Sequence, residues 1–125
     1  MDFAIDYGGS PQDVTITAFG VADVTGYLRM CAALTADERF RPGMRILVEQ
    51  PDLDMTHCTD ADVEQIAASL AARDWNYPPR AVAVVVSEKS AEGARLGVLH
   101  LGGTQSKRRL FDSREDALAW LGEQR

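Results

Sequence analysis

Hydrophobic and polar positions along this chain repeat with two different periods, and the first of them opens the sequence. Phe3, Ile5 and Tyr7 alternate with polar or small residues, which is typical of a half-buried strand. Turn-forming residues follow at positions 8–11, and the alternation resumes at 14–18. The pattern therefore predicts a hairpin at the start of the chain.

Helical spacing of apolar residues predicts four helices after this hairpin. Three of them follow a residue that caps helices well, namely Asp23, Thr59 or Ser113. The remaining helix is expected from Ser90 to about Leu101, with Gly102-Gly103 ending it.

Short apolar runs between the helices predict three further strands. They cover Arg45–Glu49, Ala81–Val86 and Lys107–Phe111. The uninterrupted branched run at Ala81–Val86 is typical of a central strand that is covered on both faces. The predicted order is β-β-α-β-α-β-α-β-α. We therefore expect an α/β fold with a mixed, mostly parallel five-stranded sheet, helices packed against it, and a single domain over residues 1–125.

Composition supports a globular protein and narrows its partners. The chain has 125 residues, with 46% hydrophobic and 26% charged, as in ordinary folded domains. Its formal net charge of −6 argues against binding to nucleic acid or to anionic membranes. No apolar run is long enough to span a membrane, and the start lacks the features of a signal peptide. Because Cys31 and Cys58 form no metal or redox motif, we expect a cytoplasmic protein with no cofactor.

Three stretches of the chain carry a recognisable pattern. They are ADERFRPGMRILVE (36–49), AEGARLGVLHL (91–101) and FDSREDALAWL (111–121). These stretches resemble the SpoIIAA-like branch of the STAS superfamily, which is named for sulfate transporters and anti-sigma factor antagonists. The resemblance extends over nearly the whole chain and implies a small mixed sheet with helices packed against it. Some relatives are cytosolic switches that bind an anti-sigma kinase, and others look like proteins with a binding site for apolar small molecules.

The sigma-regulating relatives carry a phosphorylatable Ser or Thr at the start of the helix after the third strand, within an Asp-Ser-Ser-Gly-like signature. The matching region here reads MTHCTDADV (55–63) and departs from that signature, with hydroxyls at Thr56 and Thr59. A helix start favours both a capping hydroxyl and a phosphate. Asp60 and Asp62 would repel a phosphate at this position. We interpret Thr59 as a structural cap and keep Thr59 and Thr56 as candidate phosphosites.

Two glycines and an arginine on the helix that follows residue 90 are candidate contacts for a ligand or partner. Gly93 and Gly97 share one helix face, and glycine lowers helix propensity by roughly 1 kcal/mol. Close backbone approach is the usual compensation, with the sheet as the expected neighbour and a ligand or second subunit as the alternative. Arg95 is either solvated or in contact with an acidic partner or ligand.

Other candidate contacts lie in the second half of the chain. Trp75 and Tyr77 are expected in a loop, where they either cover the core or form a contact patch. Lys107–Arg109 is expected to protect an edge strand, with an anionic partner as the alternative. His57 and Cys58 are adjacent, but no further residues at diagnostic spacing accompany them, so we expect neither a metal site nor a catalytic nucleophile.

The sequence supports two hypotheses of function, neither of them enzymatic. The first is an interaction or regulatory module of the SpoIIAA-like type, with a regulatory protein partner and a homodimer expected. The alternative is a small apolar-ligand-binding protein, with a pocket between the sheet and the Gly93–Gly97 helix. No paired carboxylates, nucleophile elbow or phosphate-binding glycine loop point to catalysis.

Overall fold

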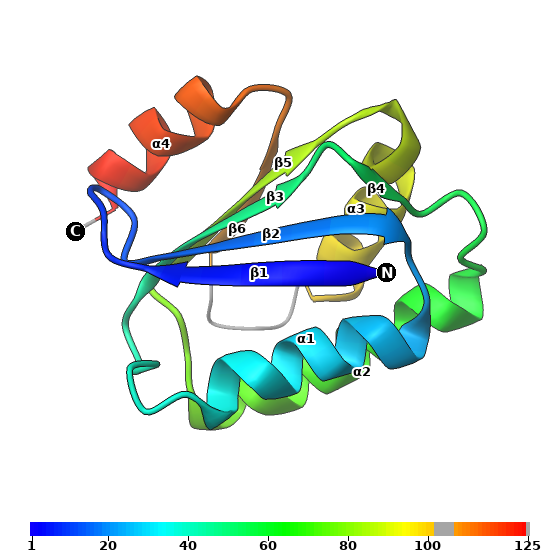
Figure 1. Cartoon of the computed structure of the whole chain (residues 1–125), viewed down its shortest axis with the longest axis horizontal. Helices are drawn as coiled ribbons and strands as arrows, with labels where there is room; N and C mark the ends of the chain where they lie inside the picture. Colours follow the sequence, from blue (N-terminus) through cyan, green and yellow to red (C-terminus); the bar gives the residue numbers. More distant parts are fainter. Residues whose placement is uncertain (102–106, 125) are drawn as a thin grey trace.

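A six-stranded sheet with helices on both faces forms the protein (Figure 1). The computed structural model describes residues 1–101 and 107–124. In chain order the elements are β1 (Asp2–Tyr7), β2 (Val14–Val21), α1 (Val24–Ala36), β3 (Arg45–Gln50), β4 (Leu53–Asp54), α2 (Asp60–Asn76), β5 (Ala81–Val86), α3 (Glu88–His100), β6 (Lys107–Phe111) and α4 (Arg114–Glu123).

The main strands lie in the order β1-β2-β3-β5-β6, with β4 paired to β2. β1 and β2 form the antiparallel hairpin, and all other pairs are parallel. This confirms the predicted α/β fold and its mostly parallel sheet. The predicted number of strands was wrong by one, because β4 contains only Leu53 and Asp54 and is too short to show a periodic pattern.

The predicted helix boundaries agree closely with the structure. Asp23, Thr59 and Ser113 each accept a hydrogen bond from a backbone amide in the first turn of the helix that follows, as expected for capping residues. α3 begins two residues before the expected Ser90, since Ser87 is its N-cap. The predicted stop at Gly102-Gly103 lies outside the described residues.

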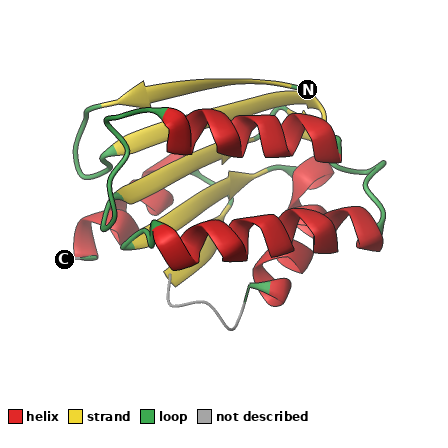
Figure 2. Cartoon of the chain, turned by 90° about the horizontal axis from the view of Figure 1, so that it is seen from below, coloured by secondary structure: helices red, strands yellow, loops and turns green. Residues whose placement is uncertain are grey.

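Helices α1, α2 and α3 cover one face of the sheet, and α4 covers the other (Figures 1 and 2). Alternate residues of each strand therefore enter two separate cores. On β3, Ile46 and Val48 face the three helices, while Leu47 between them packs against α4.

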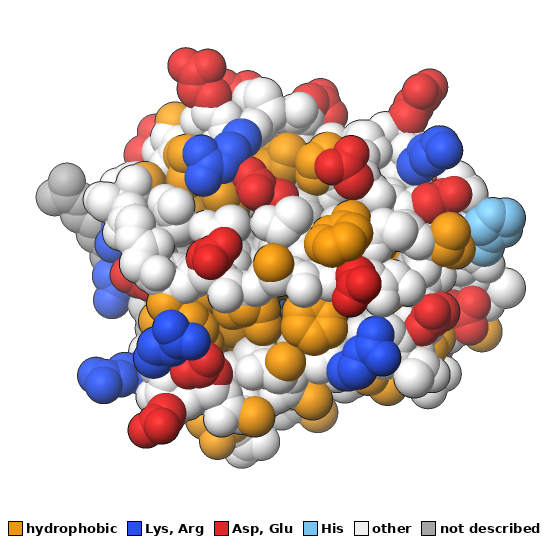
Figure 3. Space-filling view, viewed as in Figure 1, with side chains coloured by type: hydrophobic (Ala, Val, Ile, Leu, Met, Phe, Trp, Pro, Cys, Tyr) orange, Lys and Arg blue, Asp and Glu red, His pale blue; other side chains and the backbone are white. Residues whose placement is uncertain are grey.

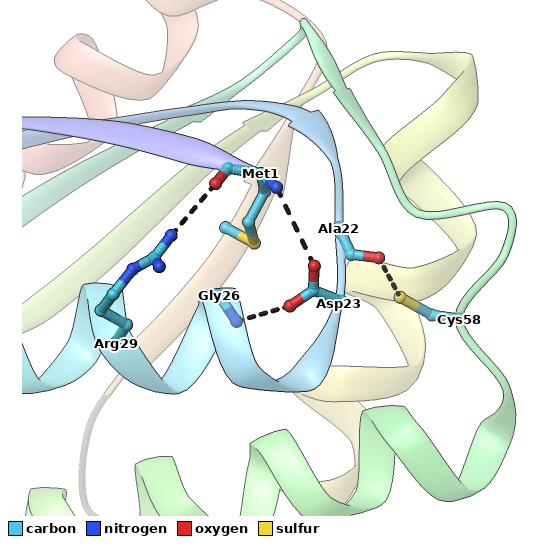
Figure 4. Close-up of polar contacts among 6 residues, drawn as sticks. All are labelled: Met1, Ala22, Asp23, Gly26, Arg29 and Cys58. Atoms are coloured by element: carbon cyan, nitrogen blue, oxygen red, sulfur yellow. Dashed lines mark hydrogen bonds and ion pairs between the residues drawn. The ribbon is translucent and has the colours of Figure 1, made fainter.

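The first residue of the chain is held against the start of α1 (Figure 4). The Met1 amino group lies 3.9 Å from an Asp23 carboxylate oxygen, and the Met1 carbonyl accepts a hydrogen bond from Arg29. A Cβ on Gly26 would overlap the Met1 side chain, so glycine permits this close contact. These contacts fix edge strand β1 to α1. Between the two elements, Figure 3 shows a gathering of hydrophobic side chains among scattered acidic and basic ones.

Candidate functional site

The candidate site with the most apolar walls is a cavity of about 110 Å³ between the sheet and the three helices of one face. Its walls are mainly apolar. The sheet contributes Ile46, Val48, Val82 and Val84, and the helices contribute Leu34, Ile66, Leu70 and Val98. A single buried water needs only about 10–15 Å³, and an engineered apolar cavity of roughly 150 Å³ binds benzene. This cavity is therefore of a size that suits a small organic molecule.

One polar group in the wall is the amide of Gln50, at the end of β3. Gln50 is only 1% exposed, and its Nε2 donates a 2.8 Å hydrogen bond to the hydroxyl of Tyr27 on α1. Its Oε1 is buried and has no partner. The Gln50 backbone carbonyl accepts a hydrogen bond from the Ser90 hydroxyl at 2.9 Å, which fixes this residue in place. Burial raises the pKa of Tyr27 far above its ordinary value, so the phenol is neutral.

Further polar side chains of the cavity wall lie near the carboxyl end of α2. Arg108, on β6, forms a 2.6 Å ion pair with Asp74, and both side chains are 9% exposed. Arg73 also lines the cavity, and its Nη1 is buried without a partner. Cys31, on α1, lies near Arg73. Burial raises the pKa of the Cys31 thiol, and Arg73 opposes this effect without cancelling it.

Phe40 and Tyr77 lie together in the cavity wall. Their ring centroids are 6.1 Å apart, and Phe40 is buried while Tyr77 is 41% exposed. The chain reaches Phe40 from α1 and then turns at Gly43, whose φ of +83° requires glycine. From the sequence, Trp75 and Tyr77 were expected in one loop. Instead Trp75 lies in the last turn of α2 and is 85% exposed, so only Tyr77 covers the core.

The two glycines of α3 both line the cavity. A Cβ on Gly93 would lie 2.9–3.1 Å from Met55 side-chain atoms, whereas a Cβ on Gly97 would meet only Val63 of α2, at 3.9 Å. The expectation that the sheet is their close neighbour was therefore wrong. Gly93 makes room for Met55, and Gly97 leaves open space that belongs to the cavity.

The candidate contact Arg95 lies away from the cavity. It forms two hydrogen bonds to Glu92 one turn earlier on α3, at 3.1 and 2.6 Å, and both side chains are largely exposed. These bonds lower the pKa of the Glu92 carboxyl. Arg95 is thus a surface residue whose charge has a local partner.

Thr59 is part of a capping box at the start of α2. Its hydroxyl accepts from the Asp62 amide at 3.1 Å, and the Asp62 carboxylate accepts from the Thr59 amide at 3.0 Å. The Thr56 hydroxyl instead donates to Asp54 at 2.6 Å. Both predicted phosphosite hydroxyls therefore have structural partners, which favours the capping interpretation of Thr59.

Cys58 lies between these two threonines and the start of α1. Its thiol donates to the Ala22 carbonyl at 3.7 Å (Figure 4), and burial raises its pKa. A raised pKa reduces the thiolate fraction and with it the nucleophilic reactivity. In the part of the chain that the structure describes, no group of three or more His, Cys, Asp or Glu side chains converges as a metal site would require.

Sequence reasoning missed the polar residues of the cavity. The predicted strand ended at Glu49, yet Gln50 continues the inward alternation of Ile46 and Val48 on β3, and that period was the available signal. Arg108 was treated as one member of a charge run. On β6 it points inward while Lys107 is exposed, so strand alternation would have separated them.

A solved structure has the same fold as this chain. An uncharacterised protein from Shewanella loihica PV-4, described as a DUF3478-family protein with a SpoIIAA-like fold, superposes with a TM-score of 0.64. The identity is 22%, over 95% of this chain and 93% of that chain. This likeness shows that the chain has the SpoIIAA-like fold, as the sequence resemblance predicted. Comparisons with protein families and with curated proteins give no match.

The described helices include none that is both long enough and apolar enough to cross a membrane. Edge strand β6 carries the basic run at Lys107–Arg109, at the position where charged residues protect a sheet. The expectations of a cytoplasmic location, a homodimer and a regulatory partner stay predictions.

Proposed function

We propose that this protein is a small apolar-ligand-binding protein, and that its binding site is the cavity between the sheet and helices α1, α2 and α3. The observation that carries this proposal is the cavity itself, about 110 Å³ in volume and lined mostly by apolar side chains. Well-packed interiors hold few voids larger than a water molecule. An internal site with apolar walls and a few placed polar groups is the usual form of a small-molecule site.

The proposed function is one of binding rather than catalysis. The two cysteines have neutral thiols with raised pKa values, and the buried Tyr27 phenol keeps its proton. None of these groups supplies a nucleophile or a base at neutral pH.

Benzene is a suitable neutral probe for this proposal, because it is small and lacks hydrogen-bonding groups. Titrated into the isotope-labelled protein, it should shift methyl resonances of cavity residues such as Ile46, Val84 and Leu70. Gly97→Leu should abolish these shifts because its side chain would extend into the open space next to Gly97.

Gly122→Leu is the matched control. It adds the same side chain to α4, where a Cβ would meet only Pro11 at 3.8 Å, on the opposite face of the sheet. This variant should bind benzene like the wild type. Cavity resonances that do not move in the wild-type protein would overturn the proposed function. Native mass spectrometry of freshly purified protein would in addition report a retained ligand.

The regulatory module is the second candidate function, and the exposed Trp75 favours it. An indole that is 85% exposed on the last turn of α2 is a surface feature that interfaces often use. If this residue mediates the expected homodimer, Trp75→Ala should dissociate it. Light scattering of wild type and variant over a wide concentration range tests this proposal, and a wild-type protein that stays at 13.7 kDa throughout would remove it.

A further inference from the structure

The polar atoms of the cavity wall have incomplete hydrogen bonding, and this indicates what kind of ligand the cavity accepts. Arg73 Nη1 and Gln50 Oε1 are both buried and both lack a partner. Nearly all buried polar side-chain atoms in folded proteins have a hydrogen-bond partner, because an unmet one is destabilising. If the oxygen and nitrogen of the Gln50 side-chain amide exchanged places, the oxygen would accept a hydrogen bond from the Tyr27 hydroxyl. The amide nitrogen would then be the atom without a partner. The wall therefore presents at least two polar groups that a ligand could satisfy.

The charges at the carboxyl end of α2 do not cancel. Arg108 and Asp74 neutralise each other in their ion pair, and among the described residues no carboxylate pairs with Arg73. The neighbouring Cys31 thiol is protonated because burial raises its pKa. One uncompensated positive charge is thus left in the wall of an apolar cavity.

A purely structural role explains Arg73 less well. A basic residue in the last turn of a helix interacts favourably with the helix dipole, and Arg73 is the basic residue in the last turn of α2. An arginine in that role can keep its whole guanidinium group in water. Here Nη1 is buried and Arg73 lines the cavity.

We propose that the cavity binds a small apolar carboxylic acid, whose carboxylate pairs with Arg73 and whose hydrocarbon body contacts the apolar wall. This inference rests on the proposed ligand-binding function and names the class of its ligand. A planar carboxylate matches the planar guanidinium fork. A phosphate group would bring more negative charge than the single free positive charge offsets, and would lie near the Asp74 carboxylate.

Hexanoate and hexanamide are probes that test the inference, since they share a chain and a planar head and differ in charge. Isothermal titration of the whole protein should give an affinity for hexanoate at least roughly tenfold higher than that for hexanamide, because hydrogen bonds between charged groups are stronger than those to neutral ones. Equal affinities, or a preference for hexanamide, would overturn the carboxylate inference.

Arg73→Met should remove the preference, because it weakens hexanoate binding much more than hexanamide binding, and Arg73→Lys should retain part of it. Arg95→Met, which removes an arginine on the exposed face of α3, is the control and should keep the full preference. A preference that survives in Arg73→Met would overturn the assignment to Arg73. If Arg73→Met does not fold, the ratio of hexanoate to hexanamide affinity, measured in the wild type and in Arg73→Lys, still tests the inference.

The outcomes also separate this inference from the proposed function. Benzene binding without a preference for hexanoate contradicts only the inference, whereas no binding of benzene, hexanoate or hexanamide contradicts the proposed function.

Discussion

The two faces of the sheet are packed differently, although the same strands contribute to both. On the α4 face a small cluster is buried, and every member is at most 5% exposed: Leu47, Ala81, Ala83, Val85, Ala117 and Leu121. On the other face three helices cover larger side chains, enclose a cavity and bury polar atoms without partners.

The size of the contact residues accounts for much of this difference. Ala81 and Ala83 on β5 meet Ala117 on α4, and such small side chains let a helix lie close to a sheet. On the opposite face β5 presents the larger side chains of Val82, Val84 and Val86. Both faces are apolar, so apolar character alone does not determine how tightly a core is filled. The three-helix face, which encloses the cavity, is therefore the face that has space for a ligand.

The largest expected effect is a loss of stability when a buried leucine is truncated, and it should differ between the two faces. Leu121→Ala should lower the free energy of unfolding by about 4 kcal/mol, because Leu121 is fully buried in the cluster on the α4 face. Leu34→Ala should cost only about 2 kcal/mol, because Leu34 lines the cavity and lacks packing partners on that side. Urea unfolding of both variants measures the difference. Equal losses would show that the two faces are packed alike.

The next effect concerns the polar end of the cavity. Asp74→Asn should lower the free energy of unfolding by about 3 kcal/mol, because it removes a carboxylate that lies 2.6 Å from the buried guanidinium of Arg108. Glu92→Gln, in the exposed pair with Arg95, is the matched control and should cost much less, because solvent screens this pair. Denaturant unfolding compares the two, and similar losses would contradict a structural role for the buried pair.

Local sequence patterns were enough to predict most of the fold. The alternation of Phe3, Ile5 and Tyr7 and the branched run at Ala81–Val86 correspond to β1 and β5. The caps were equally visible, as at Thr59. In each case the signal arises from neighbouring residues, whose spacing alone identifies the element. Only β4 was missed, because its two residues are stabilised by a pairing with distant β2.

The candidate site could be predicted only in part, because its residues are far apart in sequence. Gly93 and Gly97 were singled out because glycine inside a helix needs a reason, but the close neighbour expected for them was the sheet, and the structure places Met55 and Val63 there instead. The meeting of Gln50 with Tyr27, and of Asp74 with Arg108, depends on how α1, α2 and β6 pack. No local pattern contains that information.

A smaller effect is expected at the start of α2, where a substitution should lower stability without changing ligand affinity. Thr59→Ala should lower the free energy of unfolding by about 1 kcal/mol, because it removes one of the two bonds of the capping box on α2. Thr59→Asn should cost little, since asparagine caps equally well. Benzene affinity should not change, because Thr59 does not line the cavity.

Thr56→Ala is the control for this cap and should cost less, since Thr56 bonds only to nearby Asp54 in an exposed loop. Urea unfolding measures all three variants. Stoichiometric phosphate on Thr59 in protein taken from its native cells would contradict the purely structural interpretation of this hydroxyl and strengthen the regulatory candidate.

The smallest effect lies within the cavity face and compares the two glycines of α3. Alanine is favoured over glycine in a helix by up to about 1 kcal/mol. At Gly97 the added Cβ has room, with Val63 at 3.9 Å, so Gly97→Ala should raise the free energy of unfolding by about 0.5–1 kcal/mol. At Gly93 the same atom would press on Met55 at 2.9–3.1 Å, and the overlap should cancel or reverse the gain. Thermal and urea unfolding measure both variants. If Gly97→Ala is the less stable of the two, the open space assigned to the cavity beside Gly97 is not there.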